Sequence, residues 1–113
     1  MPKLRIPLRV VLYRDDGAWV AHCLEFDLMG DGATRGEALR HLDEAIALQV
    51  EATLESGSWS NLFRPAPGRF LEMFAAGKDV AMGELHVQGD SLTISELATR
   101  EYSDETADDL ARV

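Results

Sequence analysis

The residues of this chain that could support chemistry are few, and most of them lie in its first half. His22 and Cys23 are neighbours, and a histidine beside a thiol invites comparison with cysteine enzymes. Adjacent residues of an extended strand point to opposite faces, however, so these two cannot act as a nucleophile and its base. We therefore interpret Cys23 as a small buried apolar side chain. Because it is the only cysteine, an internal disulfide is excluded.

A second group of candidate residues is acidic and lies near expected turns. Asp15, Asp27 and Asp31 could hold Mg²⁺ for nuclease chemistry, because oxygen ligands suit that ion. Asp15 and Asp16 fit a hairpin turn better, since aspartate bonds its own backbone there. Acids near the entrance of a helix also suit the helix dipole. A divalent-metal nuclease is thus an alternative that the pattern disfavours, and neither a metal nor a cofactor site is predicted.

Net charge limits the partners of the protein. There are 11 Lys and Arg against 20 Asp and Glu, a formal net charge of −9, which opposes attraction to phosphate backbones and favours a basic partner or simple solubility. Arg5 and Arg9 form a local exception, since they alternate onto one face of the first expected strand. We interpret this basic strip as the charged protection of an edge strand, with protein contact left open and DNA binding disfavoured.

The chain shows no sign of membrane insertion or export. No stretch approaches the roughly 18 consecutive apolar residues of a membrane span. The N-terminal residues interleave charges with apolar side chains, whereas a signal peptide separates them. A cytoplasmic location is the default expectation.

Period-two patterns predict three strands. Residues 4–13 alternate apolar and polar side chains, so one face of this strand should be buried. Pro7 cannot donate to a ladder, and should therefore sit at an edge or at an irregular point. Residues 15–17, Asp-Asp-Gly, are turn chemistry, so residues 18–24 return as the second strand of a hairpin. Residues 28–30 predict a brief third strand.

A long helix should follow these strands. Thr34 is a good N-cap, Glu37 completes a capping box, and Gly57 is the expected terminating residue. We expect Gly30 and Gly32 to let the backbone turn sharply into this helix. Burial of its apolar stripe should dominate the stability of the fold. The stripe comprises Ala38, Leu39, Leu42, Ala45, Ile46 and Val50.

The second half predicts smaller elements. Residues 69–76 read as a short helix, and a hairpin around residues 89–90 would pair Val87 with Leu92 and Leu85 with Ile94. The expected class is α+β: an antiparallel three-stranded sheet with one main helix packed on a face (β-β-β-α), then a short helix and a C-terminal β-hairpin. We expect one domain over 1–100, with a core at 4–57 and an extension at 58–100, followed by an acidic tail over 101–113.

An ordered set of motifs within residues 4–57 resembles one family. The chain carries an aromatic-Val-Ala strand, a short acidic and apolar link, a Gly-x-Thr step, and two Glu-Ala-aliphatic repeats in the helix. Together these resemble the domain of HicB-type antitoxins. The motifs are Trp19-Val20-Ala21, Glu25-Phe26-Asp27-Leu28, Gly32-Ala33-Thr34, Glu37-Ala38-Leu39 and Glu44-Ala45-Ile46.

The resemblance implies a partial ribonuclease-H-like fold that lacks catalytic residues. Members of the family bind and mask a small basic RNA-cleaving toxin of the HicA type, and they are often dimers or tetramers. Many also carry a C-terminal ribbon-helix-helix or helix-turn-helix domain. Residues 58–113 read as neither, and residues 25–30 depart from the proline-rich acidic turn, followed by Gly and Cys, that is usual at this link.

The sequence therefore predicts a non-catalytic protein-binding module, an antitoxin or related regulator that forms a homo-oligomer. The alternatives are a stand-alone oligomeric scaffold or regulator without a toxin, and the metal nuclease considered above. Candidate partner-binding residues are Arg5, Arg9, Trp19, His22, Glu25, Asp27 and Asp31.

Overall fold

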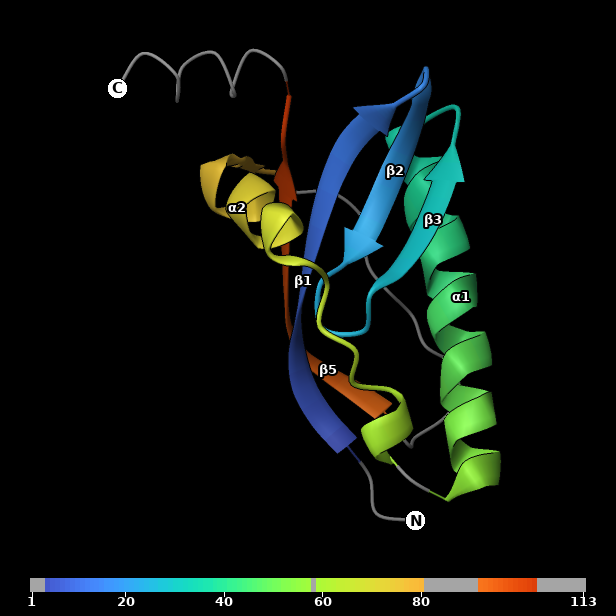
Figure 1. The fold of residues 1–113 in the computed structure, drawn as a ribbon. Coiled ribbons are helices and arrows are strands. Elements are labelled where there is room, and N and C mark those ends of the chain that lie inside the picture. Colours follow the sequence, from blue (N-terminus) through green and yellow to red (C-terminus); the bar gives the residue numbers. More distant parts are fainter. Residues whose placement is uncertain (1–3, 58, 81–91, 104–113) are drawn as a thin grey trace.

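A computed structural model describes residues 4–57, 59–80 and 92–103, and within them the chain has a mixed α+β fold (Figure 1). It combines a five-stranded sheet with two α-helices and one short 3₁₀ turn. The elements are β1 (Leu4–Asp15), β2 (Ala18–Cys23), β3 (Leu28–Gly32), α1 (Arg35–Ser56), η1 (Trp59–Asn61), α2 (Gly68–Ala76), β4 (Lys78–Asp79) and β5 (Leu92–Glu101).

The sheet is mixed, with strand order β3-β2-β1-β5-β4. The predicted antiparallel pairing of the first three strands is confirmed. The sheet is larger than predicted, however, because β5 runs parallel to β1 along its other side, and the two-residue β4 pairs with β5. A parallel neighbour requires a long crossover, which α1 and the segment after it supply here.

Only the second arm of the predicted C-terminal hairpin lies within the described residues. Its first arm, which includes Leu85 and Val87, lies outside the described residues. Its second arm is β5, whose Leu92 and Ile94 stand opposite Leu4 and Ile6 of β1. β5 ends at Glu101, where the sequence suggested that the acidic tail begins, and residues 104–113 also lie outside the described part.

The position of β1 corrects the idea that it is an edge strand guarded by Arg5 and Arg9. β1 is central, between β2 and β5. Only its first half resembles an edge, because β2 pairs with it from Val10 onward. Pro7 lies in that half, next to a register shift against β5, so the predicted irregular point is confirmed.

The α1 helix begins and ends as predicted. The Thr34 hydroxyl accepts a hydrogen bond from the Glu37 backbone N–H at 3.1 Å, and Gly57 takes the left-handed conformation at φ 78°. The apolar stripe packs on the sheet with Leu8, Val10 and Leu12 of β1. Each large side chain of that stripe stabilises the fold by about 1.5–3 kcal/mol. Its fully or almost fully buried members are Ala38, Leu39, Leu42, Ile46 and Val50.

Gly30 and Gly32 have a different role from the one predicted. Both lie within β3, and neither has a positive φ. A Cβ on Gly30 would lie 2.1 Å from the backbone nitrogen of Leu42 and 2.4 Å from the carbonyl oxygen of Ala38. These glycines therefore bring α1 into direct contact with the strand. The separately predicted hairpin turn between β1 and β2 is confirmed by the positive φ values of Asp16 and Gly17.

The opposite face of the sheet is partly covered by α2, which confirms the predicted short helix (Figure 1). Phe70 of α2 packs against Val11 of β1 and Leu24 in a second apolar cluster. The half-buried Tyr13 and Tyr102 border this cluster. The sheet thus has helices on both faces. Neither described helix is long and apolar enough to cross a membrane.

Candidate partner-binding surface

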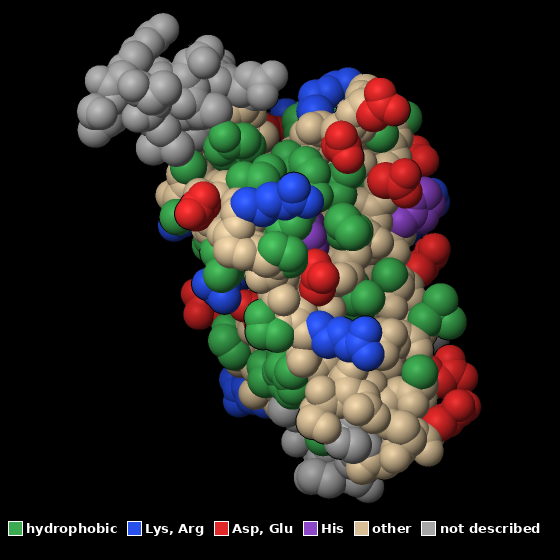
Figure 2. Space-filling view, in the orientation of Figure 1, with side chains coloured by type: hydrophobic (Ala, Val, Ile, Leu, Met, Phe, Trp, Pro, Cys, Tyr) green, Lys and Arg blue, Asp and Glu red, His purple; other side chains and the backbone are tan. Residues whose placement is uncertain are grey.

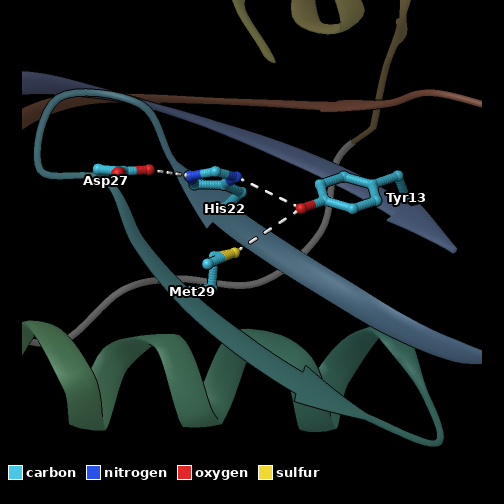
Figure 3. Close-up of polar contacts among 4 residues, drawn as sticks. All are labelled: Tyr13, His22, Asp27 and Met29. Carbon is cyan, nitrogen blue, oxygen red and sulfur yellow. Dashed lines mark hydrogen bonds and ion pairs between the residues drawn. The ribbon is translucent and has the colours of Figure 1, made fainter. Parts of the chain in front are cut away.

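His22 is the centre of a polar network on the face of the sheet that α2 covers (Figure 3). Its side chain is fully buried, and its Nε2 lies 2.7 Å from Oδ1 of Asp27. A carboxylate can only accept a hydrogen bond, so Nε2 of His22 carries a hydrogen and donates the hydrogen bond to Asp27. The other ring nitrogen lies 3.4 Å from the hydroxyl of Tyr13, and the ring packs on Phe70 with centroids 4.2 Å apart.

Local backbone geometry places the four residues drawn in Figure 3. His22 on β2 stands directly opposite Met29 on β3, so both side chains share one face. Tyr13 reaches them from β1, with its hydroxyl 3.8 Å from the sulfur of Met29. Asp27 lies in the turn between β2 and β3 at φ 53°, a left-handed conformation that aspartate tolerates better than most residues. Its bond to His22 holds this turn in place.

The row Asp27–His22–Tyr13 has the order of an acid, a base and a nucleophile, but its environment does not suit catalysis. His22 is not accessible to a substrate. Burial, reinforced by the charge of Asp15, raises the pKa of Tyr13, so the phenol keeps its proton at neutral pH. We therefore assign the network a positioning role: it fixes the β2–β3 turn and the strand that follows.

Cys23 lies on the opposite face, in the main core, and should be unreactive. Burial raises the pKa of its thiol from 9.0 to about 12. We expect an aromatic disulfide reagent at pH 8 to leave the folded protein unmodified and to react quickly in denaturing urea. Because the unfolded thiol ionises first, the free energy of unfolding should also fall as the pH rises from 9.0 to about 12. Rapid labelling of the folded protein would contradict this placement.

The exposed part of the site is the β3 rim, which we define as Asp27, Met29 and Asp31. Met29 is 54% exposed, which is high for a large apolar side chain, and an exposed carboxylate lies on each side of it along the chain. β3 ends the sheet as the structure describes it. The carbonyl of Asp31 accepts a hydrogen bond from His41 of α1, so this backbone group is already occupied.

The β3 rim lies beside an acidic margin of the molecule. Figure 2 shows acidic side chains along the side formed by β3 and α1. Among the described residues, a cationic partner is therefore attracted more strongly to this side than to the others. The exposed acids of the β1–β2 turn, β3 and α1 are Asp15, Asp16, Asp31, Glu44, Glu51 and Glu55.

The seven residues predicted for partner binding fall into separate places. His22, Asp27 and Asp31 come together at the β3 rim and beneath it. Arg9 and Glu25 form an ion pair of 2.7 Å on the same face, which neutralises half of the basic strip. Arg5 lies exposed on the first half of β1.

Trp19 lies on the other face of the sheet from His22, because it packs against the main core on the α1 side. Arg14 and Arg35 lie over its ring. Conversely, the sequence did not identify Met29 and Tyr13 as site residues. Alternation along each strand gives the face of each side chain, but only the register between strands shows that Met29 stands opposite His22.

The carboxylates considered for a metal site are not brought together. Within the described ranges, no group of three or more His, Cys, Asp or Glu side chains is placed to hold a metal ion. Comparison with known proteins adds no assignment: no family model, no curated protein and no solved structure matches this chain.

Proposed function

We propose that the protein is a HicB-like binding module that masks a small basic RNA-cleaving protein by contacts at the β3 rim. The observation that carries the proposal is the exposed Met29 held between two carboxylates on an edge strand. The family-like motifs support it, because they fall on β2, on β3, on the turn between them and on α1, which together build this rim. In this proposal the chain has no catalytic role of its own.

The chemistry of the β3 rim suits a cationic protein surface. Asp27 and Asp31 can each receive an Arg or Lys side chain, and charge-assisted pairs of this kind are stronger than neutral hydrogen bonds. Met29 supplies an apolar and adaptable centre that a partner side chain can cover. The acidic margin beside the rim would accelerate the encounter. An RNA-cleaving protein needs cationic side chains to hold its substrate, and the rim would occupy them.

The buried support of the rim favours tight binding. His22 fixes Asp27, and Tyr13 contacts both His22 and Met29, so the rim is held in place before a partner arrives. Binding to a preorganised surface loses less conformational entropy than binding to a flexible one. The fully buried His22 would thus contribute to affinity without touching the partner.

The proposal is tested by expressing the chain together with any small basic protein that is encoded next to it. We expect the two to co-purify, and the chain to suppress cleavage of RNA by its partner in a stoichiometric manner. If the basic protein remains free and active in the presence of excess chain, the proposed function is wrong.

One observation favours a second function, that of an oligomeric scaffold without a toxin. Leu48, on the outer face of α1, is 69% exposed, and Leu54 is exposed nearby. Two copies that met through this face would also bring Glu51 of each copy together, and like charges destabilise such a contact. A strictly monomeric mass by light scattering would exclude this alternative.

A further inference from the structure

A cleft of about 460 Å³ lies where the parallel strands β1 and β5 end, away from the β3 rim. Its volume falls within the range of small-molecule sites, roughly 300–1,000 Å³. In open sheets, ligands commonly bind beyond the carboxyl ends of parallel strands. The proposed masking function uses only one of its lining residues, Tyr13, which supports the β3 rim from beneath. Its principal lining residues are Tyr13, Arg14, Trp19, Arg35, Glu101 and Tyr102.

Two guanidinium groups lie over one indole ring at this cleft. The central carbons of Arg35 and Arg14 are 4.2 Å and 5.1 Å from the centroid of Trp19. Stacking on an aromatic face fixes the plane of a guanidinium while its N–H groups stay available at the edge. The lining therefore offers fixed cationic donors in a protein whose net charge is −9.

The two arginines differ in how far they are neutralised. Arg35 forms an ion pair with Glu101, another lining residue. Arg14 donates to the backbone carbonyl of Gly17 at 3.1 Å, a neutral acceptor, and within the described residues no carboxylate forms an ion pair with it. The lining side chains thus retain one net positive charge, which suits a ligand with a single anionic group near Arg14.

Two tyrosines, one methionine and Ser103 complete the lining. Tyr13 and Tyr102 border the cleft from β1 and from the residue after β5, and Met73 of α2 adds an apolar contact. Flat apolar walls of this kind favour a planar ring, which gains contact area with little loss of conformational entropy. A long polyanion is disfavoured, because the net charge of −9 of the whole chain repels it.

We propose that this cleft binds a small planar anion, an aromatic ring that carries a carboxylate or phosphate group. Arg14 pairs with the anionic group, Arg35 flanks it, and the ring packs against the two tyrosines and Met73. Nucleotides and aromatic carboxylates both have this chemistry. Arg14 and Arg35 are not part of the β3 rim, so variants of Arg14 test ligand binding separately from partner masking.

The test is a calorimetric titration of the full chain with adenosine 5′-monophosphate and, separately, with indole-3-carboxylate. Adenosine supplies a ring without the anion, and inorganic phosphate supplies the anion without the ring. We expect at least one of the two ring anions to bind saturably with a Kd below about 1 mM, and both controls to bind at least about tenfold more weakly. The ring anion that binds more tightly shows which of the two ligand classes, nucleotides or aromatic carboxylates, the cleft prefers.

Variants of Arg14 connect the binding to this cleft. Arg14→Gln should weaken the ring anion by about tenfold or more, because a charge-assisted pair is lost, and Arg14→Lys should weaken it less. Arg40→Gln, at an exposed position on α1, removes one positive charge elsewhere and should bind as the unmodified chain does. Absence of saturation by both ring anions, equal binding of either control, or unchanged affinity in folded Arg14→Gln overturns the proposal.

Discussion

Replacing Gly30 with alanine is expected to lower the free energy of unfolding by about 3 kcal/mol or more, because the added methyl group overpacks the core. The new Cβ would lie within 2.7 Å of backbone atoms of Ala38, His41 and Leu42. Backbone atoms cannot rotate away as the end of a flexible side chain can, so α1 must move off β3. That movement exposes the apolar stripe of α1, whose burial provides much of the stability.

Gly36→Ala is the matched control for this prediction. Gly36 lies in the first turn of α1, where an added Cβ meets nothing within 4 Å. Alanine is the better helix former, so this variant should gain up to about 0.5–1 kcal/mol. Urea denaturation followed by circular dichroism measures both variants. A Gly30→Ala protein as stable as its Gly36→Ala counterpart would show that α1 does not contact β3 at this point.

The second large effect is expected on partner binding. Met29→Lys places a charge in the apolar centre of the β3 rim, and Asp31→Lys reverses the charge beside it. Each should weaken the complex with the basic partner by about 2 kcal/mol or more, roughly a thirtyfold increase in Kd, as for a central residue of an interface. Both positions are exposed, so the fold should remain intact.

Glu51→Lys controls for overall charge. It makes the same change in net charge as Asp31→Lys, at an exposed position of α1 away from the rim. We expect it to slow association modestly and to leave the dissociation rate unchanged. A charge outside the contact surface only steers the approach of the partner, whereas a charge that pairs with the partner also holds the complex together. Surface plasmon resonance separates the two rates. Equal losses of affinity in Asp31→Lys and Glu51→Lys would reduce the role of β3 to general electrostatic attraction.

Local features of the fold were predictable from the sequence. The N-cap at Thr34, the left-handed Gly57 and the Asp-Asp-Gly turn each depend on a few neighbouring residues, and all are present as predicted. The pairing of β5 was not predictable in this way. Its alternation fits a hairpin with the preceding residues and a parallel partner equally well, and β1 lies more than 80 positions earlier in the chain.

The candidate site shows the same division between local and distant information. Alternation along β2 correctly placed His22 and Trp19 on opposite faces. The part played by Gly30 depends on where α1 crosses β3, and the exposure of Met29 depends on β3 being an edge strand. Neither fact is encoded within a short window, so the glycine was assigned to a turn and the methionine was overlooked.

The most direct test of the proposed function is amide hydrogen exchange of the chain, alone and in complex with its basic partner. The account predicts slower exchange on binding in β3 and in the β2–β3 turn, from Asp27 to Gly32, with little change on the outer face of α1 around Leu48. Protection confined to α1, with β3 exchanging as in the free chain, would contradict the assignment of the β3 rim as the binding surface.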